Sequence, residues 1–179
     1  MGNEPDAAVV LVCGCRPPSV NNVTGRGRDE FGAALAVSYK DAGRPRTDGL
    51  LYGVVCWFTI GYSPGTEPDA DNISKGVWDI LSDRKSGDGA GRYRLGAFAD
   101  DKQVRVRVAG IFDLLSRDGD APALSDLDLG SLPTHVLRQL ESMVSDAVQG
   151  KPLIRHLTYI RFGRLSAAAY NLSPLGGVP

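Results

Sequence analysis

Residues 67–81, EPDADNISKGVWDIL, follow a long apolar run at residues 50–60, LLYGVVCWFTI, and these two stretches decide the fold. The apolar run is rich in β-branched and aromatic residues, which favour a strand buried on both faces. In the second stretch, apolar residues recur at helical spacing from Ile73 to Leu81. Either Asp71 or Asn72 can cap the first turn of such a helix. The pattern therefore predicts a central strand joined by a loop to an amphipathic helix.

The rest of the chain alternates between strand-like and helix-like patterns. β-Branched apolar runs predict strands, and apolar residues at helical spacing predict helices. A Gly-rich, basic loop at residues 83–96 and an acidic, turn-rich connector at residues 113–132 interrupt these patterns. We expect further strands at residues 7–15, 104–108 and 153–162, and further helices at residues 30–40 and 134–149.

Length and composition bound the class of protein. A chain of 179 residues is long enough for one domain with a hydrophobic core. No window is apolar over the roughly 20 residues that a membrane span needs, and the acidic start lacks the basic region of a secretory signal. Three cysteines, an odd and sparse count, do not make a disulfide framework. We therefore expect a cytoplasmic protein with no membrane partner.

Charge is unevenly distributed along the chain, although the formal net charge is only −1. Residues 113–128 are strongly acidic, whereas residues 16–46 and 151–164 carry most of the clustered Arg and Lys. Nucleic-acid-binding domains are often strongly basic, so the near-zero sum argues against high DNA affinity. Separate patches of both signs still allow one positive face.

Two acidic pairs are the strongest chemical signal. Asp69 and Asp71 precede the predicted helix, and Asp100 and Asp101 precede the strand expected at residues 104–108. Side chains two apart in extended chain point the same way, so the first pair can reach one ion. Crowded carboxylates raise one another's pKa, and a divalent cation relieves that repulsion. The pattern therefore indicates a Mg²⁺ site with phosphate chemistry.

Basic side chains are spaced to join this acidic group. Lys75 follows Asp71 by four residues, which places both on one side of the helix. Lys75 can then offset negative charge on a phosphate or a leaving group. Asp101 shares strand parity with Arg105 and Arg107, which would line up a metal ligand with two phosphate-binding guanidiniums.

A purely structural interpretation of these motifs remains open. The DADN stretch can be a helix cap and the Asp pair a solvated turn; only their combination with Lys75 favours a metal site. His135 and His156 are isolated in the sequence. Ser19 and Ser74 lack a paired His, so a Ser-His-Asp hydrolase is rejected.

Three segments of the chain resemble the RusA-type crossover-junction endodeoxyribonucleases, a family of Holliday junction resolvases. RPPSVNN, residues 16–22, resembles the family's Pro-Pro-Ser-Asn-Asn motif with Val20 as an extra residue. PDADNISKGVWDIL, residues 68–81, resembles its D-x-D-N-x-x-K-x-x-x-D-x-L core. FADDKQV, residues 98–104, resembles its W-x-D-D-x-Q-V element. Order and spacing agree, apart from a longer Gly-rich loop.

The resemblance implies an α+β fold, a two-layer mixed β-sheet packed with helices, and a homodimer. It implies cleavage of four-way DNA junctions with Mg²⁺, or with Mn²⁺, in DNA recombination and repair. A metal-binding and catalytic role carries over to Asp69, Asp71 and Asp101, and a charge-stabilising catalytic role to Lys75. Asn72 and Asp100 also match, as possible supporting residues.

DNA binding is expected from basic and amide side chains in the matched segments and the loops beside them. Such contacts to the phosphate backbone make affinity fall steeply with salt. A two-fold dimer would present two sites to a junction, so paired symmetric nicks follow from symmetry. The expected DNA-binding residues are Arg16, Asn21, Asn22, Arg26, Arg28, Arg84, Lys85, Arg105 and Arg107.

The resemblance also divides the chain into two parts. Residues 1–112 form the RusA-like core, and residues 113–179 form an extension of acidic connector, helix and strand that packs on or extends the same domain. Two other functions remain open at this point. The chain can be a non-cleaving DNA-binding relative, or a metal-dependent nuclease acting on other branched DNA such as flaps or forks.

Overall fold

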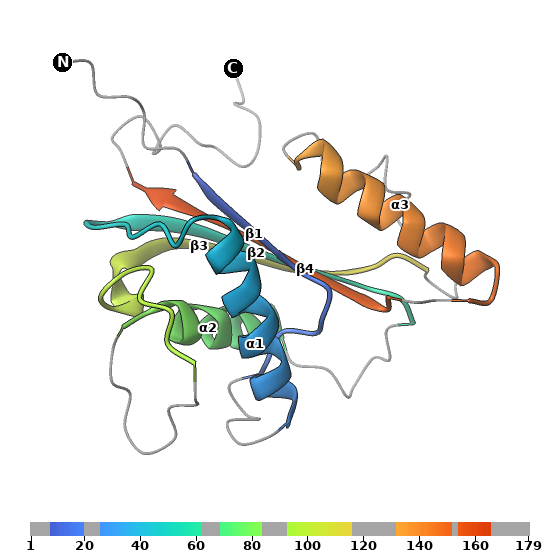
Figure 1. Ribbon diagram of the computed structural model, residues 1–179, viewed down its shortest axis with the longest axis horizontal. Helices are drawn as coiled ribbons and strands as arrows, with labels where there is room; N and C mark the ends of the chain where they lie inside the picture. The colour runs from blue at the N-terminus through green and yellow to red at the C-terminus, as the bar shows by residue number, and fades with distance from the viewer. Residues whose placement is uncertain are drawn as a thin grey trace.

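The computed structural model describes residues 8–19, 26–61, 69–83, 93–115, 132–151 and 154–165. This part of the chain has an α+β fold, with one four-stranded mixed sheet and helices on both of its faces (Figure 1). Its elements in chain order are β1 (Val9–Cys13), α1 (Arg26–Asp41), β2 (Leu51–Thr59), α2 (Ala70–Leu81), the 3₁₀ helix η1 (Asp101–Gln103), β3 (Val104–Asp113), α3 (Thr134–Val148) and β4 (His156–Arg164).

The order of strands in the sheet is β1-β4-β2-β3. β2 and β3 are parallel, while β4 is antiparallel to both β1 and β2. β2 is therefore an interior strand, as its apolar sequence predicted. The last strand of the sequence lies between the first two, so the C-terminal segment is part of the same sheet as the segments before it.

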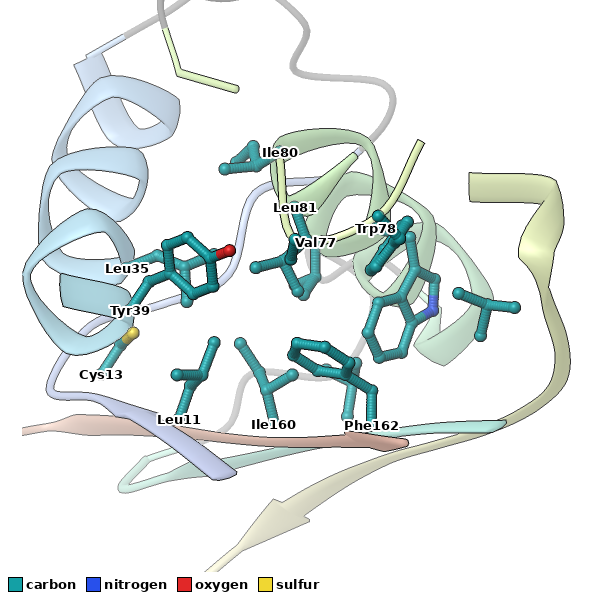
Figure 2. Close-up of a cluster of buried hydrophobic side chains, with 14 of the residues drawn as sticks. Leu11, Cys13, Leu35, Tyr39, Val77, Trp78, Ile80, Leu81, Ile160 and Phe162 are labelled. Atoms are coloured by element: carbon teal, nitrogen blue, oxygen red, sulfur yellow. The ribbon is translucent and has the colours of Figure 1, made fainter. Parts of the chain in front are cut away.

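α1 and α2 cover one face of the sheet, and α3 covers part of the other (Figure 1). Figure 2 shows Leu11, Ile160 and Phe162 of the sheet pointing toward the side chains of α1 and α2. On the opposite face, α3 places Leu140 against a second apolar cluster. The sequence predicted two layers; α3 adds a third, because its apolar stripe requires a sheet face of its own.

The position of α2 depends on a close approach at Gly53. A Cβ atom at this residue would lie 2.5 Å from the ring of Trp78, which is closer than van der Waals contact allows. The indole of Trp78 is fully buried in the space that the missing side chain leaves. This contact fixes α2 across β2 and β3, with its polar side toward solvent.

Several boundaries differ from the sequence prediction. α1 begins at Arg26 rather than residue 30, and β3 continues to Asp113 rather than residue 108. The cap of α2 is Asp69, not Asp71 or Asn72. All three side chains can cap a helix, and sequence alone does not show which of them keeps an extended backbone.

In the described part of the chain, no helix has both the length and the apolar character needed to cross a membrane.

Candidate functional site

The first turn of α2 holds the first acidic pair. The Asp69 carboxylate accepts a hydrogen bond from the backbone N–H of Asn72, at 2.8 Å. Asp69 has extended backbone angles, whereas Asp71 already lies inside the helix. The expectation that both residues lie on an extended segment and point the same way is therefore wrong. Asp69 stabilises the helix end, and Asp71 is exposed two residues further along.

A polar stripe runs along α2 opposite its buried face. It consists of Asp71, Lys75 and Asp79, spaced four residues apart. Asp71 and Lys75 are exposed, and Asp79 is half-buried. Residues at this spacing lie on one side of a helix, as the sequence predicted for Asp71 and Lys75. We call these three residues the α2 stripe.

The second acidic pair lies in the turn that leads into β3. The Asp100 carboxylate accepts a hydrogen bond from the backbone N–H of Lys102 at 3.0 Å, and Gln103 accepts one from the Asp100 N–H at 2.9 Å. The Gln103 amide also donates to the carbonyl of Gly49, at 2.9 Å. Asp100 thus shapes the turn, and Gln103 ties the turn to the segment before β2.

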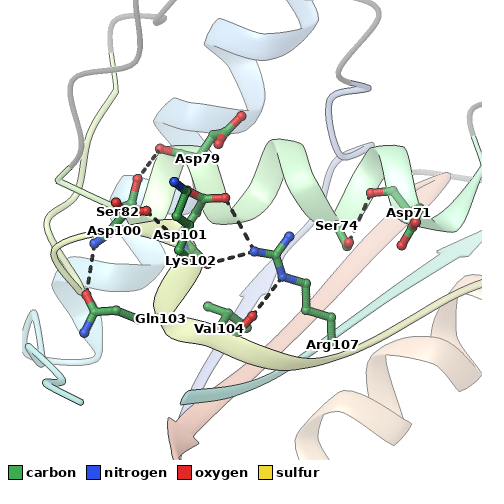
Figure 3. Close-up of polar contacts among 10 residues, drawn as sticks. All are labelled: Asp71, Ser74, Asp79, Ser82, Asp100, Asp101, Lys102, Gln103, Val104 and Arg107. Carbon is green, nitrogen blue, oxygen red and sulfur yellow. Dashed lines mark hydrogen bonds and ion pairs between the residues drawn. The ribbon is translucent and has the colours of Figure 1, made fainter. Parts of the chain in front are cut away.

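Asp101 is held by Arg107 of β3 (Figure 3). The guanidinium and the carboxylate of this pair are 3.4 Å apart. Arg107 also donates to the backbone carbonyls of Asp101, at 2.8 Å, and Val104, at 3.0 Å. The side chain of Asp101 is only 13% exposed, whereas that of Arg107 is 31% exposed, so the pair is partly open to solvent on the arginine side.

The parity expected for Asp101, Arg105 and Arg107 does not hold. Asp101 belongs to the 3₁₀ helix η1, not to a strand. The register of β2 and β3 shifts between Val104 and Val106, so Arg105 has no paired residue on β2. Such a bulge breaks the alternation of side chains. Arg107 nevertheless reaches Asp101, because it is paired with Gly53 on the face that α2 covers.

Opposite charges converge around Asp79. Burial raises the pKa of its carboxyl, and the charge of Asp101 raises it further. Arg28, Lys75 and Arg107 oppose this shift of the Asp79 pKa. Charged residues from α1, α2, η1 and β3 therefore affect the pKa of Asp79 at this place. The sequence patterns gave Asp79 no role; its spacing of four residues from Lys75 was the available signal.

The carboxylates do not form a ready metal site in this arrangement. Among the described residues, no three His, Cys, Asp or Glu side chains are grouped so that they could hold a metal ion. Figure 3 shows Asp101 beside the Asp79 end of α2 and Asp71 toward its other end. The trio of Asp69, Asp71 and Asp101 is therefore not gathered around one point.

The expected DNA-binding residues fall into two groups. Arg16 and Arg28 line a cavity beside α1, while Arg105 and Arg107 are exposed on the edge strand β3. The guanidinium of Arg16 lies over the Trp57 ring, 5.2 Å from its centre. The others lie outside the described residues or, for Arg26, have a side chain that is not described: Asn21, Asn22, Arg26, Arg84 and Lys85.

No protein-family model matches the chain, and comparison with curated proteins finds no match.

Proposed function

We propose that the chain is a structure-selective endodeoxyribonuclease that resolves Holliday junctions by paired symmetric nicks in DNA recombination and repair. The observation that carries the proposal is the meeting of the α2 stripe with the Asp100–Asp101 turn. These segments are separated by the Gly-rich loop in sequence, yet the charge of Asp101 raises the pKa of Asp79. A nuclease needs such a mixed set of acids and cations, because it must bind an anion and then stabilise additional negative charge.

Residues of the α2 stripe have distinct parts in the proposal. Asp71 is exposed and is the carboxylate best placed to face a phosphodiester. Lys75, one turn along, supplies positive charge to a phosphate bound there. Arg107 holds Asp101 in place and has a side chain that is 31% exposed, so it can also contact DNA backbone.

Mg²⁺ is the proposed cofactor, with Mn²⁺ as an alternative. Mg²⁺ is usually bound by one or two carboxylates together with substrate phosphates and waters. A site of that kind does not need three grouped protein ligands. The proposal therefore predicts a requirement for the ion that is tested by activity and binding in the presence of DNA.

A homodimer is part of the proposal, because two symmetric nicks need two related sites. Support comes from β3, which is an edge strand of the sheet. Val106 and Val108 on this strand are 41% and 44% exposed. Apolar side chains on an exposed edge favour pairing with a second chain.

Asp71→Asn tests the assignment. We expect the variant to lose nicking of a synthetic four-way junction in Mg²⁺ by about a hundredfold or more, as is typical for loss of a key electrostatic group. Junction binding is expected to be kept or improved, because one repulsive charge is removed. Glu141→Gln, on the exposed side of α3, is the matched control and should cut normally. Parental cleavage by Asp71→Asn would overturn the site.

A non-cleaving DNA-binding protein is the second candidate. Two observations favour it: Asp69 serves as a helix cap, and Asp101 is paired with Arg107. A gel shift of the junction with no product in Mg²⁺ or Mn²⁺ would select this alternative. Cleavage of flaps or forks at rates equal to those for the junction would instead indicate a nuclease for other branched DNA.

A further inference from the structure

A cavity of about 520 Å³ lies where the end of β1, the start of α1 and the start of β4 meet. Its volume falls in the range of small-molecule sites, roughly 300–1,000 Å³. The α2 stripe does not line it. The cavity is lined by Gly14, Cys15, Arg16, Pro17, Pro18, Ser19, Gly27, Arg28, Glu30 and His156.

The charges around the cavity are mainly positive. Arg16 and Arg28 line it, with Glu30 as the acid among its lining residues. The buried Nε of Arg28 has no hydrogen-bond partner in the described part of the chain. Two guanidiniums at one cavity favour a phosphate group, which each can bind through two parallel hydrogen bonds.

His156 gives the cavity a neutral polar group. Burial lowers the pKa of its imidazole, and the charges of Arg16 and Arg155 lower it further. Its Nδ1 is 3.0 Å from the hydroxyl of Thr59, which leaves Nε2 as the atom it can offer to a ligand. The ring also packs on Trp57, with 5.7 Å between ring centres. A fixed aromatic ring whose Nε2 has no hydrogen bond among the described residues suits contact with a nucleobase edge or face.

The cavity is next to α2. The carbonyl of Pro18 would lie 2.7 Å from a Cβ atom at Gly76, so this part of the cavity wall packs directly on the helix. Arg28 lines the cavity, and its charge also lowers the pKa of Asp79 in the α2 stripe. A DNA strand with one phosphate on the stripe therefore has a neighbouring nucleotide within reach of the cavity.

We propose that this cavity binds one unstacked nucleotide of the DNA strand. Its phosphate lies at Arg16 and Arg28, and its base enters the space beside His156. The volume exceeds what a phosphate alone would fill. Nucleotides that have already lost their neighbours, as at a branch point, cost least to move out of the stack. The proposal rests on the nuclease function above and adds how the enzyme would recognise the branch.

Cys15 provides a readout that does not depend on cleavage. It lines the cavity and is half-buried. The pKa of its thiol is lowered by a hydrogen bond from Cys13, while burial raises the pKa of Cys56 to about 11. N-ethylmaleimide should therefore react first at Cys15, because the thiolate is the reactive form. The reaction is followed by peptide mass spectrometry.

Three probes are compared: the four-way junction, thymidine 5′-monophosphate and inorganic phosphate. At ten times its dissociation constant, a bound probe leaves about one site in eleven free. We expect alkylation of Cys15 to slow about tenfold with the junction and with the mononucleotide. A junction that shifts on a gel but leaves the rate unchanged overturns the proposal. Equal protection by phosphate and mononucleotide at equal concentration overturns the nucleotide assignment.

The outcomes separate this proposal from the nuclease function. Protection by the mononucleotide without any junction binding would support the cavity and refute the nuclease. Junction cleavage without protection of Cys15 would do the reverse. Failure of the cavity proposal and failure of the nuclease function can therefore be told apart.

A filled cavity gives a second test. Gly27 is exposed, and a Cβ atom there meets no atom of the described residues within 4 Å, which leaves room for a larger side chain. Gly27→Phe should weaken mononucleotide binding about tenfold or more by occupying the space, whereas Glu141→Gln, at an exposed residue that does not line the cavity, should bind normally. Equal binding by both variants would contradict the proposal. Circular dichroism checks that each is folded.

Discussion

At the scale of the residue, Asp79 is a carboxyl group whose environment opposes its charge. Burial is the main cause of its raised pKa, and Asp101 adds to it. The folded chain therefore holds a proton on Asp79 to higher pH than the unfolded chain does. Stability from this group is present at low pH and is lost as pH rises through the raised pKa.

Asp79→Asn should therefore stabilise the protein at neutral pH, because the amide has no charge to bury. We expect a higher midpoint of thermal unfolding than the parent at pH 7, with the difference shrinking as pH falls toward 3.8, the ordinary pKa of the group. Scanning calorimetry over this pH range measures the difference in the unfolding midpoint. Glu141→Gln is the control for loss of one surface acid. A lower midpoint at pH 7 would show that attraction to Arg28 and Arg107 outweighs burial.

At the scale of the element, α2 combines a stability role and a proposed catalytic role at one residue. The Asp69 carboxylate caps the helix, while the resemblance also makes it a metal ligand. Ser caps a helix about as well as Asp but cannot bind a cation as a carboxylate does. Substitution at Asp69 can therefore separate the two roles.

Asp69→Ala should lower the free energy of unfolding by about 1 kcal/mol, the usual value of a lost cap, and Asp69→Ser should keep most of it. Both should lose junction cleavage if the carboxylate takes part in catalysis. Urea denaturation and the nicking assay measure the two effects on the same samples. Full activity of Asp69→Ser would leave Asp69 as a cap only.

Local patterns in the sequence predicted most elements but not how they meet. The apolar spacing from Ile73 to Leu81 was sufficient to place α2, because it depends only on near neighbours. The bulge at Arg105 and the cavity at Cys15 and His156 depend on pairings between distant strands. Strand parity predicted Asp101 and Arg107 on one side as a metal ligand and a phosphate binder, whereas they form an ion pair and Asp101 lies in a 3₁₀ helix.

At the scale of the whole molecule, the strand order decides what can fold alone. The resemblance assigns the core to residues 1–112, yet β1 pairs only with β4 in the described sheet. β4 also supplies Ile160 and Phe162, both fully buried against α1 and α2. A resemblance in sequence could not reveal the role of β4, because matched motifs do not show which distant segments pack into one core.

A fragment of residues 1–112 should therefore not fold, although it contains every matched motif. Without β4, β1 has no partner, and the core loses two large side chains that would each cost about 2–5 kcal/mol to truncate. That loss approaches the whole stability of a typical domain. We expect no cooperative thermal transition in circular dichroism, against a cooperative one for the full chain.

Adding the separate fragment 113–179 should restore the cooperative transition if the sheet assembles from both parts. A cooperative transition in the first fragment alone would mean that β1 finds another partner, and the strand order β1-β4-β2-β3 would not be what stabilises the fold.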